Sequence, residues 1–421
     1  MMIAAKKVPP KFMKKFLFQL SCAIGFACLS ASAWSGIKEA RTAYAQGDFA
    51  SALTQIKPLA EGGDAESQFF LGELYEKGVG VVQDNKQAMV WYTKAADKGN
   101  VDAQFKLGSR YSARGTSTDI KAAVLWLRKA SLQGHADAQF ELAKLYSANP
   151  SPVHDDSAAV LWMRKAAERQ HGQAELELGK FYASGKGVSK DSRLATIWYR
   201  KAAESGLSEA QFLLASALET GSGITQNIPV AVEWYVRAGN QGDLKSQIRL
   251  AKLFSTGQGI SKDESQAAGW YMKAAEQGDA ESQFQIANLY DKGEVVPRNF
   301  AATLNWLKKA AEQGHLAATC NLASIYAKGR GVIADPPAAV SLYRKAADQG
   351  YPEAQYNLGW MYANGLGIST DIVQAHMWFN LAATAGDKDA LKNRQLAETM
   401  MSRAQLETAQ ALARDWLAKR R

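Results

Sequence analysis

"KDESQAAGWYMKAAEQGDAESQFQIANLY", residues 262–290, decides the fold, because close copies of this stretch stand on both sides of it. A large apolar residue recurs every 36 residues along the copies, except at the first step, where the spacing is 126 − 91 = 35. The positions in this register are Trp91, Trp126, Trp162, Trp198, Trp234, Trp270, Trp306, Leu342 and Trp378. A period of roughly 20 to 50 residues is typical of a solenoid of stacked repeats, so the stretch is a structural unit and not a binding site.

Each copy predicts two helices joined by a turn. The first helix has an apolar stripe that includes Tyr75, and beside it a small position, such as Gly72, that is Gly or Ala in every copy. A side chain of this size lets packed helices approach to roughly 8–10 Å. The second helix places Ala88, Trp91 and Ala95 on one face. This spacing predicts that the tryptophan is a core side chain between small residues and not a cation-binding surface.

Acidic or amide residues stand seven positions before the tryptophan register and predict helix N-caps, because their side-chain oxygens accept hydrogen bonds from the free N–H groups of the first turn. They are Asp84, Asp119, Asp155, Asp191, Asn227, Asp263, Asn299, Asp335 and Asp371. Gln87, Gln266 and Gln374 follow three residues later and predict capping boxes, and Pro336 is expected in a first turn. Glycines after the helices predict C-caps with positive φ, with Gln170 as a departure. Metal sites and phosphate-binding loops are the alternatives, but no complete phosphate-loop motif is present.

The first 33 residues have the pattern of a secretory signal peptide. A lysine-rich start precedes an apolar stretch over residues 16–29 and then Ala31-Ser32-Ala33, which is typical of a cleavage site. We therefore expect residues 1–33 to be removed after Ala33 and the processed chain to be periplasmic or secreted, without an integral membrane span. A permanent anchor is an alternative, but the apolar stretch has 29 − 16 + 1 = 14 residues and a span needs roughly 20. A lipoprotein signal at Cys22 or Cys28 is a third option, although the preceding residues fit it poorly.

Removal of this leader would lower the formal net charge from +9 to 9 − 5 = +4, because the leader contains five lysines and no acidic residue. This balance gives no reason to expect nucleic acid as a partner. Cys320 would be the only remaining cysteine, so we expect packing and not disulfide bonds to stabilise the fold. Because Cys320 stands where other copies have phenylalanine, it is predicted to be a core residue and not a nucleophile.

A consensus of AEAQ-x-x-LG-x-x-Y-x-x-G-x-GV-x-x-D-x-x-x-A-x-x-WY-x-KAA-x-x-G recurs nine times over residues 65–387 and resembles the Sel1-like repeat, a relative of the tetratricopeptide repeat. Residues 36–63 resemble a divergent tetratricopeptide-like first unit. Residues 388–421, with a capping box at Ser402 and Gln405, are predicted to be C-terminal capping helices. The resemblance implies an all-α, right-handed superhelical solenoid of helix-turn-helix repeats. It also implies an adaptor for other proteins, and its exported bacterial members include cell-envelope assembly factors.

Catalytic constellations are not visible in the sequence. The five histidines fall at scattered registers and lack a metal-binding spacing such as His-Glu-x-x-His. We therefore expect no catalytic residue, no metal site and no cofactor. The favoured function is a non-catalytic scaffold or adaptor in the bacterial envelope, and a hydrolase is the weakest alternative.

By analogy with the tetratricopeptide arrangement, the residue after the small position of each first helix faces the inner groove of the solenoid. This register contains the predicted partner-binding residues Lys144, Lys180, Lys252, Asn288 and Trp360. The lysines suit carboxylates of a protein, a peptide or an acidic glycan, and Trp360 suits an aromatic anchor. A protein partner is favoured, and a role in assembly associated with envelope polysaccharide or peptidoglycan is the second hypothesis. The alternatives are that the lysines only keep the surface hydrated and that Trp360 packs on the terminal helices.

Overall fold

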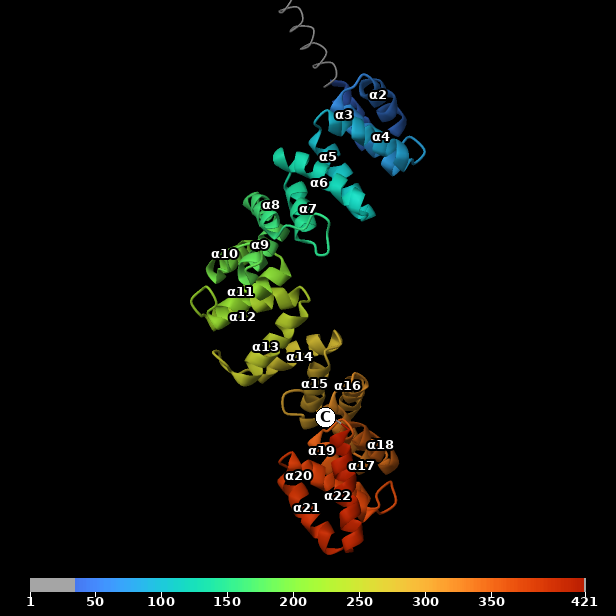
Figure 1. Ribbon diagram of the computed structural model, residues 1–421, viewed down its shortest axis with the longest axis vertical. Helices are drawn as coiled ribbons and strands as arrows, with labels where there is room; N and C mark the ends of the chain where they lie inside the picture. Colours follow the sequence, from blue (N-terminus) through green and yellow to red (C-terminus); the bar gives the residue numbers. More distant parts are fainter. Residues whose placement is uncertain (1–34, 420–421) are drawn as a thin grey trace, which may run out of the picture. The chain divides into compact units, whose positions relative to one another are not determined.

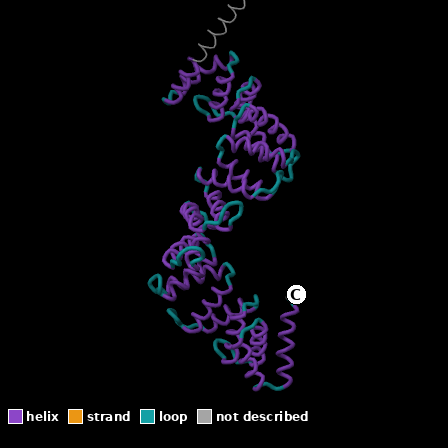
Figure 2. The backbone as a smooth tube through the Cα atoms, turned by 90° about the vertical axis from the view of Figure 1, so that its left-hand side faces the viewer, coloured by secondary structure: helices purple, strands orange, loops and turns teal. Residues whose placement is uncertain are grey.

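The computed structural model describes residues 35–419. Within this range every regular element is a helix and none is a strand (Figures 1 and 2). The chain divides into two compact units, an N-terminal unit that ends at Ala210 and a C-terminal unit that begins at Gln211. The predicted all-α solenoid of helix-turn-helix repeats is confirmed. The predicted leader over residues 1–33 lies outside the described residues and stays a prediction.

Helices alternate along each unit with short loops between them. The N-terminal unit has a helix over residues 35–45, then α2 (Phe49–Glu61), α3 (Ala65–Lys77), α4 (Asn85–Asp97), α5 (Val101–Arg114), α6 (Ser117–Leu132), α7 (Ala136–Ser147), α8 (Asp156–Glu168), α9 (Gly172–Ser184) and α10 (Ser192–Glu204). After α11 (Ser208–Thr220), the C-terminal unit continues with α12 (Ile228–Asn240), α13 (Leu244–Thr256), α14 (Glu264–Glu276), α15 (Ala280–Lys292), α16 (Phe300–Glu312), α17 (Leu316–Lys328), α18 (Pro336–Ala347), α19 (Pro352–Asn364), α20 (Ile372–Thr384), α21 (Lys388–Thr399) and α22 (Arg403–Ala418). Odd labels from α3 to α19 are the first helices of the repeats, and even labels from α4 to α20 are the second helices.

In several repeats the side chain that follows the tryptophan is more deeply buried than the tryptophan itself. Tyr92 is fully buried, and a Cβ atom on Gly72 would lie only 2.7 Å from its ring. Gly179 has the same relation to Tyr199, at 2.6 Å. The small position is therefore explained by an aromatic ring that lies against the first helix, and a larger residue would displace that ring.

The tryptophans lie closer to the surface than the sequence predicted. Lys94 Nζ is 4.0 Å from the ring centroid of Trp91, and six further repeats place a cation in the same way. The prediction of a core side chain is confirmed for Trp91, Trp162, Trp270 and Trp378, which are buried. The prediction that the tryptophan does not bind cations is wrong for its outer face, which forms a cation–π contact in seven repeats. Trp378 differs, because its ring meets Trp416 of α22 edge-on at 6.2 Å.

Buried glutamines join most first helices to the preceding second helix. Gln104 Nε2 donates to the carbonyl oxygen of Ala96 at 3.0 Å, and Gln139, Gln247 and Gln283 repeat this bond to the carbonyl eight residues earlier. These bonds satisfy carbonyl groups that a helix leaves free at its C-terminus. The fourth repeat has Glu175 at this position, and burial raises the pKa of its carboxyl group.

The predicted N-caps are confirmed at eight of the nine positions. The prediction for Asp119 is wrong, because the preceding loop is one residue shorter and Thr116 caps α6 instead. Gln266 donates to the Asp263 carboxylate at 3.1 Å instead of closing a capping box, and the boxes predicted at the other two glutamines do not form either. The box of Ser402 with Gln405 forms as predicted.

The glycines of the loops have two structural roles, helix C-capping and close contact with the preceding repeat. The sequence predicted only the capping. Gly185 has φ of +80° and caps the C-terminus of α9, as expected. Gly187, two residues later, lies against the start of α8 in the preceding repeat, where a Cβ atom would be 2.3 Å from the carbonyl oxygen of Asp156. Gly367 lies against Pro336 in the same way. The second glycine is therefore required by contact between consecutive repeats.

Gln170→Gly is expected to raise the free energy of unfolding by about 1 kcal/mol, because Gln170 has φ of +61° where most repeats have glycine. Chemical denaturation followed by circular dichroism measures the effect. Gln170→Ala is the matched control, since alanine keeps the unfavourable φ. An equal gain from alanine would show that the backbone conformation is not the cause.

Candidate interaction surface

The C-terminal unit carries four hollows at equivalent places. Each hollow lies between two successive first helices, or between α19 and α21 in the last case. An aromatic side chain of the second helix between them forms part of its wall. In chain order they include Phe212, Ser216, Tyr235 and Lys252; Tyr271, Gln285, Asn288 and Lys292; Tyr343, Tyr356, Asn357 and Trp360; and Trp360, Phe379, Leu396 and Met400. Three of the predicted partner-binding residues, Lys252, Asn288 and Trp360, therefore line hollows on one face of this unit.

Trp360 separates the last two hollows. Its side chain is 44% exposed on α19, which is unusual for tryptophan in a packed repeat. The hollow of about 330 Å³ on one side contains Tyr343 and Tyr356, and the hollow of about 270 Å³ on the other side contains Leu396 of α21. Trp360 thus shares a hollow with residues of α21 and leaves much of its ring exposed, and its role as an anchor for a partner stays a prediction.

Lys252 lies beside a hollow of about 450 Å³ that has a surplus of positive charge. Arg249 in the same wall is neutralised, because its Nε donates to Glu219 Oε2 at 3.0 Å and its Nη2 contacts Oε1. Burial disfavours the charged form of Glu219, but the hydrogen bonds from Arg249 and Tyr235 outweigh it and lower the pKa. Lys252 Nζ forms no hydrogen bond or ion pair within residues 35–419, although the carboxylate of Glu281 is close enough to interact with its charge.

Asn288 occupies the second hollow, of about 380 Å³. Its side-chain oxygen accepts a hydrogen bond from Asn321 Nδ2 at 3.3 Å, so its own Nδ2 group faces outward as a donor. Tyr271 and Lys292 stand nearby. The wall combines these donors with the carboxylates of Glu264 and Glu294, so the hollow offers both donors and acceptors to a ligand.

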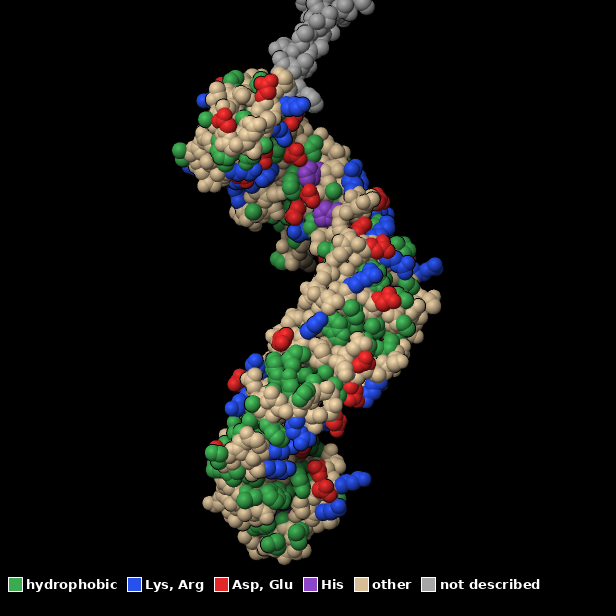
Figure 3. All heavy atoms as spheres, turned by 180° about the vertical axis from the view of Figure 1, so that it is seen from behind, with side chains coloured by type: hydrophobic (Ala, Val, Ile, Leu, Met, Phe, Trp, Pro, Cys, Tyr) green, Lys and Arg blue, Asp and Glu red, His purple; other side chains and the backbone are tan. Residues whose placement is uncertain are grey.

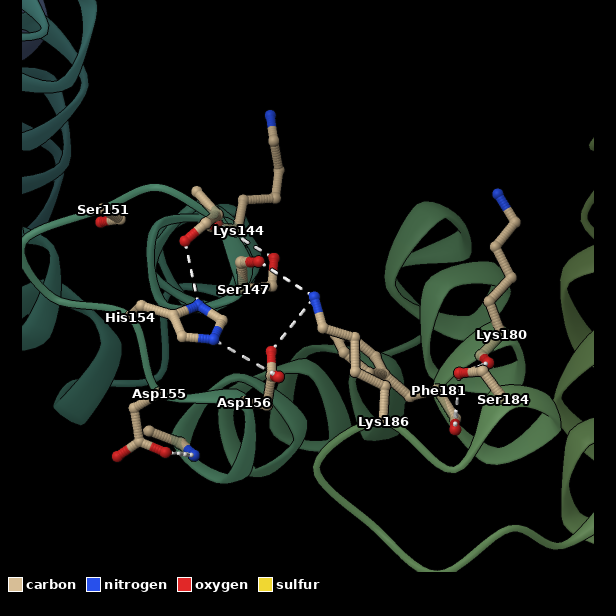
Figure 4. A network of polar contacts seen from close by, with 12 residues as sticks. Lys144, Ser147, Ser151, His154, Asp155, Asp156, Lys180, Phe181, Ser184 and Lys186 are labelled. Atoms are coloured by element: carbon tan, nitrogen blue, oxygen red, sulfur yellow. Dashed lines mark hydrogen bonds and ion pairs between the residues drawn. The ribbon is translucent and has the colours of Figure 1, made fainter.

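Lys144 and Lys180 belong to the N-terminal unit and are already paired. Lys180 Nζ lies 2.8 Å from Glu177 and 2.8 Å from Glu209, and Lys144 Nζ lies 3.1 Å from Glu141. Burial opposes the charge of Lys180, but the hydrogen bonds to the two glutamates outweigh it and raise the pKa. Figure 4 shows both side chains extending from α7 and α9. An incoming carboxylate would have to compete with these glutamates, so the two lysines stay predictions of lower value than Lys252.

A polar network joins the third and fourth repeats near these lysines (Figure 4). His154 Nδ1 donates to the carbonyl oxygen of Ala148 at 3.0 Å, and Nε2 lies 3.5 Å from Asp156 Oδ2. Lys186 Nζ contacts Asp156 at 3.1 Å, and Ser151 Oγ donates to Leu145 O at 3.4 Å. A serine hydrolase needs the histidine to face the serine hydroxyl, and here the ring faces Asp156 instead. The network fixes the loop after α7 and does not form a nucleophile–base pair.

Three histidines share a register that sequence reasoning missed. His135, His171 and His315 are N-caps of first helices, and Nδ1 of each accepts a backbone N–H three residues later at 3.1–3.2 Å. Each ring stacks on a phenylalanine of the preceding first helix, and Nε2 points toward a carboxylate. Figure 3 shows histidines beside acidic side chains. The sequence could have indicated this role, because other repeats have an aspartate or asparagine N-cap at the same position, such as Asp243.

Cys320 is buried in α17, which confirms the prediction of a core residue. Burial raises the pKa of its thiol to about 12, so the thiol is protonated at neutral pH and is a poor nucleophile. Within residues 35–419, no group of three or more His, Cys, Asp and Glu side chains has an arrangement that would hold a metal ion. No helix in the same range combines the length and apolar character that crossing a membrane requires.

A protein-family model described as the Sel1 repeat matches nine consecutive segments between residues 65 and 387. The chain belongs to the Sel1 repeat family. Its matched segments are residues 65–100, 101–135, 136–171, 172–207, 208–243, 244–279, 280–315, 316–351 and 352–387. Each Sel1 repeat thus begins at a first helix and ends after a second helix, as the sequence period indicated.

Solved structures of other Sel1 repeat proteins resemble the chain over most of its length. One is c5321, a protective antigen present in uropathogenic Escherichia coli strains displaying an SLR fold, with 32% identity, 94% of each chain covered and a TM-score of 0.65. Another is a Sel1 repeat protein from Oxalobacter formigenes, with 29% identity, 80% of this chain and 94% of that chain covered and a TM-score of 0.55. No curated protein matches the chain. These similarities support a repeat scaffold of the kind that binds proteins.

Proposed function

We propose that this Sel1 repeat protein is a non-catalytic scaffold, exported to the bacterial envelope, that binds an extended segment of a partner protein along the first helices of its C-terminal unit. The row of hollows from Lys252 to Trp360 is the observation that carries the proposal. A row of separate hollows on one face suits a chain that inserts side chains at intervals.

The repeat spacing fits an extended polypeptide. Packed helices lie roughly 8–10 Å apart, and an extended chain advances roughly 3.3 Å per residue, so about every third residue of the partner can reach a new hollow. The ammonium group of Lys252, which forms no ion pair within residues 35–419, favours an acidic residue at one end of the segment. The exposed ring of Trp360, with Tyr343 and Tyr356, favours an apolar or aromatic side chain at the other end.

Export is supported by the leader pattern of residues 1–33 and by the similarity to an Escherichia coli protein that is described as a protective antigen. A non-catalytic role is supported by the geometry around His154, which lacks a serine within reach of the ring nitrogen that a hydrolase would use. Detection of Trp34 as the N-terminal residue of the protein from the periplasm or the medium is the expected result for export. A chain that retains residues 1–33 in the cytoplasm would contradict it.

Affinity capture from an envelope extract tests the partner proposal, with residues 34–421 as bait and quantitative mass spectrometry as readout. We expect a protein that the wild-type bait enriches and that Trp360→Ala/Lys252→Glu loses. Lys345→Glu is the matched control, because Lys345 lies on a second helix and its variant should retain the partner. Retention of acidic glycan and not of protein by a folded bait would favour the polysaccharide-associated alternative.

A further inference from the structure

Four consecutive second helices of the N-terminal unit expose an aliphatic side chain at the same position, one residue before the tryptophan. Val90, Leu125, Leu161 and Ile197 are 46%, 55%, 52% and 51% exposed. The equivalent residues of the next four repeats are Glu233, Gly269, Asn305 and Ser341. A single exposed aliphatic residue is ordinary, but a row that is confined to one unit is a feature of that unit.

These side chains occupy equivalent positions on the second helices of successive repeats, and packing contacts join α4 to α6 and α6 to α8. Trp126 of α6 packs against the core that contains Ala95 and Ala96 of α4. The guanidinium of Arg169, at the end of α8, lies 2.5 Å from where a Cβ atom of Gly134 would be, just after α6. The four aliphatic residues thus recur at equivalent positions of successive second helices, and we call them the aliphatic row.

Basic residues border the row on both sides. They stand four residues before or four residues after the aliphatic residue, on the same face of the helix. They are Lys86, Lys94, Lys121, Lys129, Lys165, Arg193 and Lys201, and the remaining position is Ser157. We call these cations and the four aliphatic residues the basic–aliphatic face.

The cations of this face keep their charge available. None of the seven side chains forms an ion pair with a carboxylate within residues 35–419, and four of them lie over tryptophan rings instead. On the first helices of the same unit, by contrast, Lys106, Lys144 and Lys180 are all paired with glutamates. Seven cations without an ion pair therefore lie beside the aliphatic row, and in the described part of the chain only Lys201 among them interacts with a carboxylate at longer range, that of Glu175.

We propose that the basic–aliphatic face binds the surface of a bilayer that contains anionic lipids. Lysine stems reach along apolar surface while their ammonium groups contact phosphate headgroups, and the aliphatic side chains enter the boundary between headgroups and acyl chains. An acidic polysaccharide would match the charge but would gain nothing from the aliphatic row. A protein partner would be expected to use a hollow for its anchor residues, and the hollows described above lie elsewhere.

Flotation with vesicles of phosphatidylcholine, with and without phosphatidylglycerol, tests the proposal on the full chain. We expect binding only to vesicles with phosphatidylglycerol, and weaker binding in high salt. Leu125→Ser/Leu161→Ser/Ile197→Ser and Lys121→Gln/Lys129→Gln/Lys165→Gln should each reduce binding by at least about tenfold. Lys273→Gln/Lys309→Gln/Lys345→Gln is the matched control in the C-terminal unit and should bind as the wild type does.

A local probe separates this face from any contribution of residues 1–34. An environment-sensitive fluorophore on Leu125→Cys, in a chain with Cys22→Ser and Cys28→Ser, should shift to shorter wavelength when anionic vesicles are added. The same fluorophore on Ser341→Cys should not shift. Unchanged emission at position 125, or equal flotation of all variants, would overturn the proposal. Binding of an acidic polysaccharide or an acidic protein without binding of vesicles would overturn it as well.

Discussion

Gly187→Ala is expected to lower the free energy of unfolding by about 3 kcal/mol. The added Cβ atom would lie 2.3 Å from the carbonyl oxygen and 2.5 Å from the carbonyl carbon of Asp156, at the start of α8. Both atoms belong to the backbone, so a change of rotamer cannot relieve the overlap. The loop after α9 would have to move away from the preceding repeat, and the contact between the two repeats would loosen.

Gly206→Ala is the matched control for this substitution. Gly206 also has positive φ, at +96°, but a Cβ atom there would have no neighbour within 4 Å. It should therefore show only the conformational cost of about 1 kcal/mol. Amide hydrogen exchange of α8 and α9 is the suitable measurement, because repeat arrays open locally. Equal effects of the two variants would show that the close approach between repeats contributes nothing.

Glu219→Ala should lower the free energy of unfolding by about 2 kcal/mol at neutral pH. Glu219 accepts a hydrogen bond from Tyr235 Oη at 2.8 Å and one from Arg249 Nε at 3.0 Å. Its removal leaves a buried hydroxyl and a partly buried guanidinium without their acceptor. Glu219→Ala/Arg249→Ala should recover part of the loss, because no unpaired charge is left.

The effect of Glu219 should also depend on pH. Because its pKa is lower in the folded chain than in the unfolded chain, its contribution is complete above the unfolded pKa of about 4.3. The contribution is lost as the pH falls through the lower folded-state pKa. Denaturation curves of wild type and variant should therefore differ most near neutral pH and converge in acid. A constant difference at all pH values would contradict the assigned role of the carboxylate.

The sequence predicted the period, the helix pairs and most helix caps, because these depend on residues within one repeat. It did not predict which apolar residue is deepest. Trp91 and Tyr92 are neighbours, and only the packing of the adjacent first helix buries the tyrosine and leaves one face of the tryptophan to Lys94. The second glycine of each loop was missed for the same reason, since its constraint comes from another repeat.

The sequence did not predict which surface lysines are paired with a glutamate of the next repeat. From the sequence, Lys180 was predicted to bind a partner, but Glu177 of its own helix and Glu209 of the next repeat both lie 2.8 Å from its Nζ atom. Lys252 occupies the same register, and Glu281, which stands where Glu209 stands in the earlier repeat, interacts with its charge without forming an ion pair within the described residues. The position of a residue within the repeat predicts which way its side chain faces. The residues that pair with its charge come from other parts of the fold and are not predicted by that position.

The contacts between successive repeats have a consequence for how such a chain evolves. The glutamine bonds, the second loop glycine and the tryptophan packing each join one repeat to the next at the same registers. Duplication or loss of a whole 36-residue segment in the gene would bring together two surfaces that already fit each other. The number of hollows on the first helices can therefore change without any change in how the core packs. Homologous proteins can lengthen or shorten their binding face by whole repeats.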